Sequence, residues 1–166
     1  MPETHPYAAE RFNPKVPMCA KSRISLTFNG NFLTMTGGNM PGVFTAVSGK
    51  KQHGNIHFLY SPDVQKLRNQ GPIPAGIYWV SPAELWERPF YDIVTSQDGW
   101  GNYRLTIHPY PSTQTYGRGG FFIHGGKNPG SAGCIDLWSS ADRFFEQLKK
   151  ELGGNYDCYI QLTVRY

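Results

Sequence analysis

The sequence lacks long hydrophobic runs and dense charge, and each absence excludes a class of protein. No apolar stretch approaches the roughly 18 residues that a membrane-spanning helix needs. Only 17% of the residues are charged, and Lys and Arg are dispersed, so the formal net charge of +4 is not gathered into a basic stripe. We therefore expect neither a membrane span nor nucleic-acid binding, although the sign of the charge fits a mild affinity for anionic polymers such as cell-wall material.

Cysteine is scarce and odd in number, at positions Cys19, Cys134 and Cys158. At most one disulfide can form, so at least one thiol is left over and the sequence is not that of a disulfide-stapled scaffold. Cys19 and Cys158 are the two that could pair, and two unrelated buried cysteines are the alternative. The remaining thiol therefore needs another explanation.

Glycine and proline are plentiful instead, at 19 and 13 residues, and 10 Phe, 10 Tyr and 4 Trp are available to build a core. Frequent Gly and Pro exclude a coiled coil or helical bundle, and the aromatics exclude a disordered chain. A chain of 166 residues fits one domain that buries roughly 70% of its unfolded surface. The composition therefore predicts a turn-rich, mainly β protein with a few short helices.

The chain divides into an irregular arm over residues 1–22 and one domain over residues 23–166. The arm has several prolines and scattered charges, and it lacks the apolar core of a secretory signal. We expect a protein that stays inside the cell or leaves by a route without a cleaved signal, unless the true start lies upstream.

Alternation of apolar and polar residues, with turn residues between the runs, predicts the strands. Residues 42–50 are expected to be the third strand of a meander that begins with residues 23–28 and 31–36. Further strands are expected within residues 77–80, 91–102, 102–110, 119–126 and 156–166.

Helices are predicted at three places. Residues 61–71 and 81–89 each open with Ser-Pro, and Glu84 completes a capping box in the second of these short helices. The longer helix covers residues 139–152 and ends at a glycine pair, with a Glu146–Lys150 pair on its surface. Its apolar face consists of Phe144, Phe145, Leu148 and Leu152.

Four glycines crowd the segment HGGKNPGSAGC between His124 and Cys134: Gly125, Gly126, Gly130 and Gly133. Such density indicates a backbone with positive φ angles, or one that approaches another group closely, for example a substrate. Gly133 directly before Cys134 leaves the thiol uncrowded. The N–H groups of that turn could then form an oxyanion hole.

A cysteine nucleophile needs a base, because only about 3% of a thiol with a pKa near 8.5 is ionised at pH 7. His124 is the candidate, since the loop of ten positions to Cys134 is long enough to bring imidazole and sulfur together. Taken singly, these residues could be a strand-end histidine and a buried cysteine. Together, and with the glycines, they indicate nucleophilic catalysis.

The segment HGG…GSAGCIDL resembles the active-site signature of YkuD-type L,D-transpeptidases, which has His-Gly followed by Ser-x-Gly-Cys and an aliphatic residue. AVSGK (residues 46–50) and GPIPAGIYWV (residues 71–80) resemble two earlier strands of that family, so the resemblance covers about residues 23–138. The short His-to-Cys step, Ala132 and Asp136 are most similar to the toxic subgroup that bacteria deliver into rivals by type VI secretion. The resemblance implies a YkuD-like mixed β-sheet or sandwich with one longer helix after the cysteine.

The resemblance also implies acyl transfer on peptidoglycan stem peptides, without a metal or cofactor. Cys134 would attack the carbonyl of the third residue and release D-Ala, leaving a thioester. His124 would carry the proton, amides at Gly133 and Cys134 would hold the oxyanion, and substrate would contact Gly125. Ser131 would brace the Gly-Cys turn or simply cap the loop. Water, a D-amino acid or another stem as acceptor would give carboxypeptidase, exchange or cross-linking activity.

The toxic subgroup implies partners and a place of action. An antibacterial effector of this kind needs a cognate immunity protein and a delivery component of the secretion system. It would act in the periplasm of the target cell.

Asp136 departs from the wider family, in which Arg or Asn at this place helps to position substrate. An acid close to the thiol would raise the thiol pKa, so we expect Asp136 to point away, orienting the site or capping the next helix. The cationic substrate contact would then come from Arg118 or Lys127.

Other readings of the sequence are weaker. His53 and His57 have i,i+4 spacing, but in a strand that spacing separates them by about 13 Å, too far for one zinc ion. His5 and His108 are expected at the surface. A papain-like or NlpC/P60-like peptidase places its Cys before its His, the reverse of the order here. A wall-binding module without catalysis is the alternative from another class.

Overall fold

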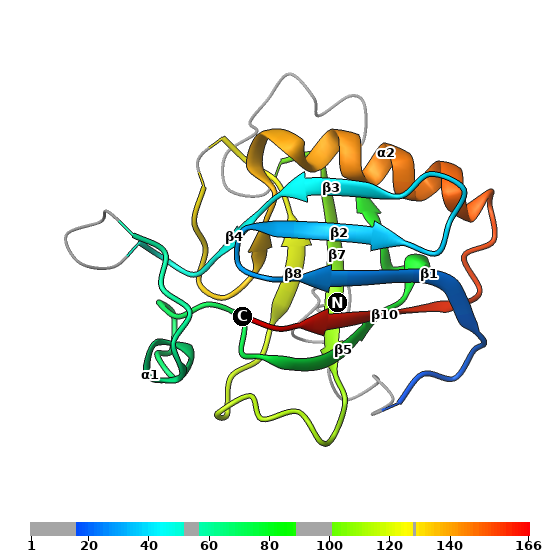
Figure 1. Cartoon of the computed structure of the whole chain (residues 1–166). Helices are drawn as coiled ribbons and strands as arrows, with labels where there is room; N and C mark the ends of the chain where they lie inside the picture. The colour runs from blue at the N-terminus through cyan, green and yellow to red at the C-terminus, as the bar shows by residue number, and fades with distance from the viewer. Residues whose placement is uncertain (1–15, 52–56, 89–100, 128) are drawn as a thin grey trace.

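Strands dominate this computed structural model, which describes residues 16–51, 57–88, 101–127 and 129–166 (Figure 1). The strands are β1 Lys21–Phe28, β2 Phe32–Thr36, β3 Gly42–Thr45, β4 Val47–Ser48, β5 Gly76–Val80, β6 Trp86–Glu87, β7 Tyr103–Pro109, β8 Phe121–His124, β9 Ile135–Asp136 and β10 Tyr159–Val164. The helices are α1 Pro62–Gln65, the 3-10 helices η3 Pro82–Glu84 and η5 Trp138–Ser140, and α2 Ala141–Leu152. The mainly β prediction, with one longer helix after Cys134, is confirmed.

The described strands form one sheet that nearly closes on itself. Its order is β3-β2-β1-β10-β5-β7-β8-β9-β4, and β6 pairs with β7 off this path. The two end strands, β3 and β4, are consecutive in the chain, with Ala46 between them. In Figure 1, β1, β2 and β3 accordingly cross in front of β7 and β8.

Two strand pairs are parallel. β1 runs parallel to β10, with Phe28 beside Val164. β8 runs parallel to β9, with Ile123 beside Ile135 and His124 beside Asp136. This second pair brings the two ends of the glycine-rich segment side by side.

The core lies inside the curved sheet, and strand alternation explains its composition. Alternate residues of β1, β2 and β10 are buried while their neighbours are more exposed, as period-two patterning predicts. These buried residues are Ile24, Leu26, Phe28, Leu33, Met35, Ile160, Leu162 and Val164.

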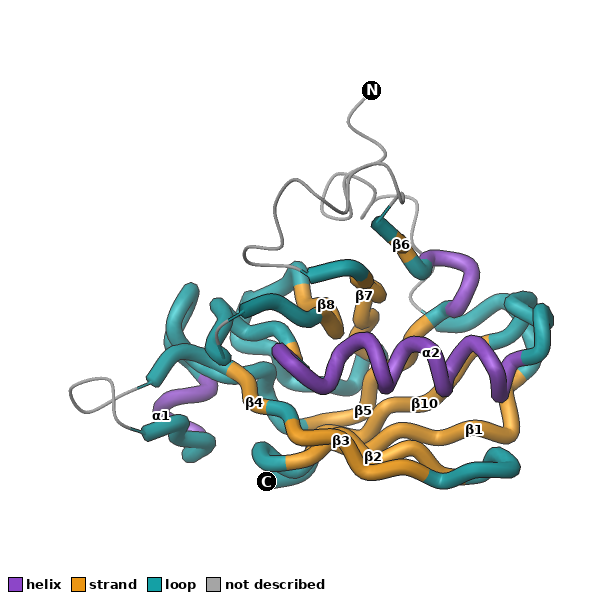
Figure 2. Tube along the Cα trace, turned by 90° about the horizontal axis from the view of Figure 1, so that it is seen from above, coloured by secondary structure: helices purple, strands orange, loops and turns teal. Residues whose placement is uncertain are grey.

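Helix α2 covers the open side of the sheet (Figure 2). Phe144 meets Phe44 of β3 edge-on, with ring centroids 5.1 Å apart. Phe145 stacks on Tyr103 of β7 at 4.9 Å. The predicted apolar face is confirmed, because all four of its residues are buried, and Gly153 ends the helix in the left-handed conformation with φ of 58°. One helix thus packs against strands from distant parts of the sheet.

The helix predicted at residues 61–71 is much shorter in the structure. α1 ends at Gln65, and Ser61 makes no side-chain cap hydrogen bond. The side-chain amide of Gln65 donates to the Tyr60 carbonyl at 2.7 Å, and its oxygen accepts from the Ala75 N–H at 2.9 Å. These two contacts fix the Gln65 side chain, and the helix ends at this residue although local propensity favours a longer one.

The predicted two-turn helix at residues 81–89 and the surface position of His108 were both wrong, for one reason. Glu84 bonds Nε2 of His108 at 2.7 Å instead of closing a capping box on Ser81. His108 is buried and stacks on Trp79 with centroids 4.3 Å apart. η3 is a single 3-10 turn, and β6 follows it.

Two further expectations differ from the structure. Residues 42–50 do not form one meander strand, because the chain leaves β3 at Ala46 and β4 pairs with β9. The second expectation was an ion pair between Glu146 and Lys150. In the structure Glu146 instead accepts a hydrogen bond from the Tyr103 hydroxyl.

Several predictions fall outside the described residues. They concern most of the N-terminal arm with His5, the His53 half of the His53–His57 pair, and most of the strand predicted at residues 91–102. No helix in the described part of the chain combines the length and the apolar character that crossing a bilayer requires.

Candidate active site

The glycine-rich segment connects two neighbouring parallel strands. β8 ends at His124, and the chain returns to begin β9 at Ile135, next to β8. Cys134 directly precedes β9, and its thiol receives a backbone hydrogen bond at Phe122 of β8. Continuing the ladder by one residue places Cys134 beside Phe122.

The register puts the imidazole and the thiol on one face of the sheet. Side chains alternate between faces, so His124, Cys134 and Asp136 share the face opposite Ile123 and Ile135, which belong to the core. Strands lie about 4.8 Å apart and two residues rise about 6.6 Å, so the backbones of His124 and Cys134 are diagonal neighbours roughly 8 Å apart. Side chains can span that separation.

His124 is held as a neutral base. Its Nδ1 donates to the Gly125 carbonyl at 2.6 Å, because a carbonyl can only accept. In the neutral ring Nε2 is then the acceptor atom. Burial lowers the pKa of His124, the Arg104 charge lowers it further, and the bond to Gly125 works in the opposite direction.

The Cys134 thiol is protonated at rest. Its side chain is buried, and burial raises its pKa to about 12. The backbone bond at Phe122 and the positive charges of Arg104 and Arg118 lower this pKa, while the Asp136 charge raises it. The site therefore holds a thiol and an imidazole, rather than a preformed thiolate and imidazolium.

Gly133 is a position that only glycine can fill without strain. Its φ is 124°, and a Cβ there would lie 2.6 Å from Nη2 of Arg118 and 3.2 Å from the Phe121 ring. At Gly125 the backbone closely approaches another residue, as expected of this loop: a Cβ there would lie 2.5 Å from Cβ of Ala141. Neighbouring groups thus pack directly against the glycine backbone of this loop, where a side chain would not fit.

Arg118 fastens the turn before Cys134 to another part of the chain. The buried guanidinium donates from Nη1 to the Gln65 and Pro72 carbonyls and from Nη2 to the Gly71 carbonyl. Nη2 also donates to the carbonyl of Ala132 at 3.4 Å. A contact between Arg118 and substrate stays a prediction; the contacts described here are with backbone carbonyls.

Ser131 and Asp136 hold the loop from inside. The Ser131 hydroxyl donates to the Cys134 carbonyl at 2.8 Å, the contact that a brace of the Gly-Cys turn requires; its part in catalysis stays a prediction. Asp136 accepts the N–H groups of Gly130 and Trp138, each at 2.9 Å, and Trp138 is the first residue of the helical turn η5.

The expectation that Asp136 points away from the thiol was wrong. It shares the face of Cys134, and its charge raises the thiol pKa. Burial in turn raises the pKa of Asp136 to about 7, so near neutral pH a large share of this carboxyl is uncharged. An uncharged Asp136 does not raise the pKa of Cys134, so the carboxyl opposes thiolate formation less than a fully ionised one would.

Two further cations lie near the loop; Lys127 was predicted from the sequence and Arg104 was not. Lys127 lies on the loop with an exposed side chain, as expected for a substrate contact that remains a prediction. Arg104 was missed, although alternation in NYRLTIHPY puts it opposite the core residues Leu105 and Ile107. It is the cross-strand partner of His124.

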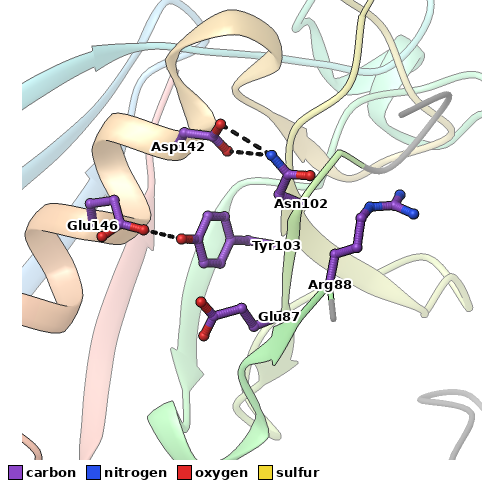
Figure 3. A pocket seen from close by; sticks show the side chains of 6 residues that line it. All are labelled: Glu87, Arg88, Asn102, Tyr103, Asp142 and Glu146. Carbon is purple, nitrogen blue, oxygen red and sulfur yellow. Dashed lines mark hydrogen bonds between the residues drawn. The ribbon is translucent and has the colours of Figure 1, made fainter. Parts of the chain in front are cut away.

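A pocket of about 320 Å³ lies between α2 and β6–β7, and the six residues that line it include neither Cys134 nor His124 (Figure 3). Its carboxylates already have partners: Glu146 with Tyr103, Asp142 with Asn102, and Glu87 with Lys149. Within the described residues, no three His, Cys, Asp or Glu side chains gather as a metal site would require.

The chain matches the Tlde1 domain over residues 42–157 and belongs to that family of type VI secretion L,D-transpeptidase effectors. No curated protein matches the chain. The matched region contains both His124 and Cys134.

Alkylation of Cys134 by iodoacetamide should accelerate steadily with pH. With a pKa of about 12, the thiolate fraction of Cys134 grows about tenfold per pH unit until that pH is approached. We expect the rate, followed by peptide mass spectrometry, to rise without a plateau between about pH 7 and about pH 10. Glutathione, with an ordinary thiol pKa, is the control that levels off in this range. A plateau for Cys134 below about pH 8 would reveal a preformed thiolate and contradict the buried-thiol description.

Proposed function

We propose that this domain is a peptidoglycan-modifying cysteine acyltransferase that cleaves the bond between the third residue and D-Ala of tetrapeptide stems. The observation that carries the proposal is the parallel β8–β9 register, which sets His124 and Cys134 on one face. Family membership supports the L,D-transpeptidase-like class. The resemblance of the HGG…GSAGCIDL segment to YkuD-type enzymes supports the choice of nucleophile.

In the proposed reaction, Nε2 of His124 takes the Cys134 proton as the sulfur attacks the carbonyl carbon of the third residue. The new C–S bond gives a tetrahedral oxyanion, which backbone amides at Gly133 and Cys134 hold. The C–N bond to D-Ala then breaks, and the imidazolium returns its proton to the leaving amine. A thioester on Cys134 remains.

The electrostatics of the site favour proton transfer during the attack over transfer beforehand. Burial raises the pKa of Cys134 and lowers that of His124, so both groups prefer their neutral forms at rest. A separated ion pair would be unfavourable there without substrate. Positive charges at Arg104 and Arg118 lower the thiol pKa and partly offset that cost.

The acceptor of the thioester decides the product. Water gives an L,D-carboxypeptidase, a D-amino acid gives exchange, and the amine of another stem gives a 3-3 cross-link. As an antibacterial effector, the enzyme would trim or cap the tetrapeptide donors and deprive the target wall of cross-links. Such a toxin requires delivery by a secretion apparatus, action in the target periplasm and an immunity protein in the producing cell.

Digestion of purified peptidoglycan tests the reaction. Wild-type protein should convert tetrapeptide muropeptides into tripeptide or exchanged products, identified by liquid chromatography and mass spectrometry. Cys134→Ala should lose at least about 1,000-fold in rate, and His124→Ala about 100- to 10,000-fold, because nucleophile and base act together. Cys158→Ala, another buried cysteine, is the matched control and should keep its activity. Muropeptides left unchanged by wild type as well as by Cys134→Ala would exclude the enzyme and favour a wall-binding module, whereas equal cleavage by both would exclude Cys134 as the nucleophile.

Expression in two compartments of a bacterial host tests the place of action. Periplasm-directed protein should swell or lyse the cells, because stem peptides lie outside the inner membrane, while the cytoplasmic form should leave growth unchanged. Periplasmic Cys134→Ala controls for export stress. Harmlessness in both compartments, with export verified by fractionation, would rule out the toxin.

A further inference from the structure

Four neighbouring strands align a basic side chain with the proposed catalytic pair. Trp86 of β6 pairs with Arg104 of β7, Arg104 pairs with His124 of β8, and His124 pairs with Asp136 of β9. Directly paired residues project to the same face of a sheet. These residues therefore form one row on the face that also carries Cys134.

The proposed donor presents a negative charge close to the bond that is cleaved. D-Ala is the last residue of a tetrapeptide stem, so its carboxylate is one residue beyond the attacked carbonyl. One residue spans about 3.8 Å along the chain. A carboxylate entering a partly buried site loses hydration and needs a cationic partner to replace it.

Arg104 suits this carboxylate better than the other two cations near the turn. The Arg118 guanidinium would have to leave the carbonyls of Gly71 and Pro72 to reach a ligand. Lys127 is exposed on the loop, outside the paired strands. Arg104 is partly buried and fixed by the ladder next to His124.

The surroundings of Arg104 also restrict its orientation. Its guanidinium carbon lies 4.8 Å from the centroid of the Trp86 ring, within cation–π distance. A planar guanidinium held on an indole keeps N–H groups along its edge, in the fork that binds a carboxylate with two hydrogen bonds. The Arg104 charge acts on the pKa of both His124 and Cys134, so its field covers the reacting groups.

We propose that Arg104 binds the terminal carboxylate of the tetrapeptide donor. This inference rests on the proposed function and deepens it, because it makes stems that end in D-Ala with a free carboxylate the preferred substrate class. Stems whose D-Ala is amidated would be poorer donors than stems with the free acid.

The test compares a synthetic tetrapeptide stem with the same peptide ending in D-alaninamide. Wild type should favour the free acid in kcat/KM by about 10- to 100-fold, the range expected for one charge-assisted hydrogen-bonded pair. Arg104→Gln should lose most of this preference, mainly by slowing cleavage of the acid, and Arg104→Lys should retain part of it. Arg143→Gln is the matched control, since Arg143 is also an arginine over an aromatic ring, 4.4 Å from the Phe44 centroid, but on α2. It should keep the wild-type preference.

The outcomes separate this proposal from the proposed function. Equal cleavage of acid and amide by wild type would overturn carboxylate recognition and leave the acyltransferase standing. No cleavage of either peptide by wild type would count against the acyltransferase itself. Loss of the preference in Lys127→Gln but not in Arg104→Gln would assign the carboxylate to Lys127 instead. Thermal melts by circular dichroism show whether Arg104→Gln is folded. If it is not, the acid-over-amide preference of wild type and of Arg104→Lys decides the proposal.

Discussion

The parallel pairing of β8 with β9 is the constraint on which the site depends. Parallel strands usually need a crossover of a dozen or more residues, often with a helix, yet here the chain returns within the short loop between His124 and Ile135. Such a return is possible because glycines adopt positive φ and pack through bare backbone. Asp136 and Arg118 then tie the loop down through backbone amides and carbonyls. Cys134 owes its place beside β8 to these contacts.

The same packing that fixes the thiol also opposes its ionisation. A buried sulfur with a pKa of about 12 is a poor nucleophile until a base removes its proton, and burial makes His124 a weaker base as well. The compensation comes from fixed positive charge. Arg118 behind the turn and Arg104 on the face that carries Cys134 both lower the thiol pKa. Asp136, which is partly neutral near pH 7, raises it less than a fully ionised carboxylate would. For the proposed reaction, these charges favour transfer of the thiol proton during attack on the substrate over transfer beforehand.

Much of the architecture could be predicted from the sequence, because local patterns decide it. Alternation gave the main strands, and the apolar face with its glycine stop gave α2. Tertiary contacts decided the rest. The surface position predicted for His108 was wrong because Glu84 bonds its ring and Trp79 stacks on it, and no local sequence pattern predicts these contacts. The Ser131 brace followed from the motif, whereas pairing of β4 with β9 depends on closure of the whole sheet.

Trapping the acyl-enzyme tests the central claim most directly. Protein incubated with a tetrapeptide stem and quenched in acid is digested and analysed by mass spectrometry. The account predicts a tripeptide acyl group on the peptide containing Cys134, labile to hydroxylamine, formed as D-Ala is released and formed at least about 100-fold more slowly by His124→Ala. Release of D-Ala by Cys134→Ala, or an acyl group on another residue, would contradict it.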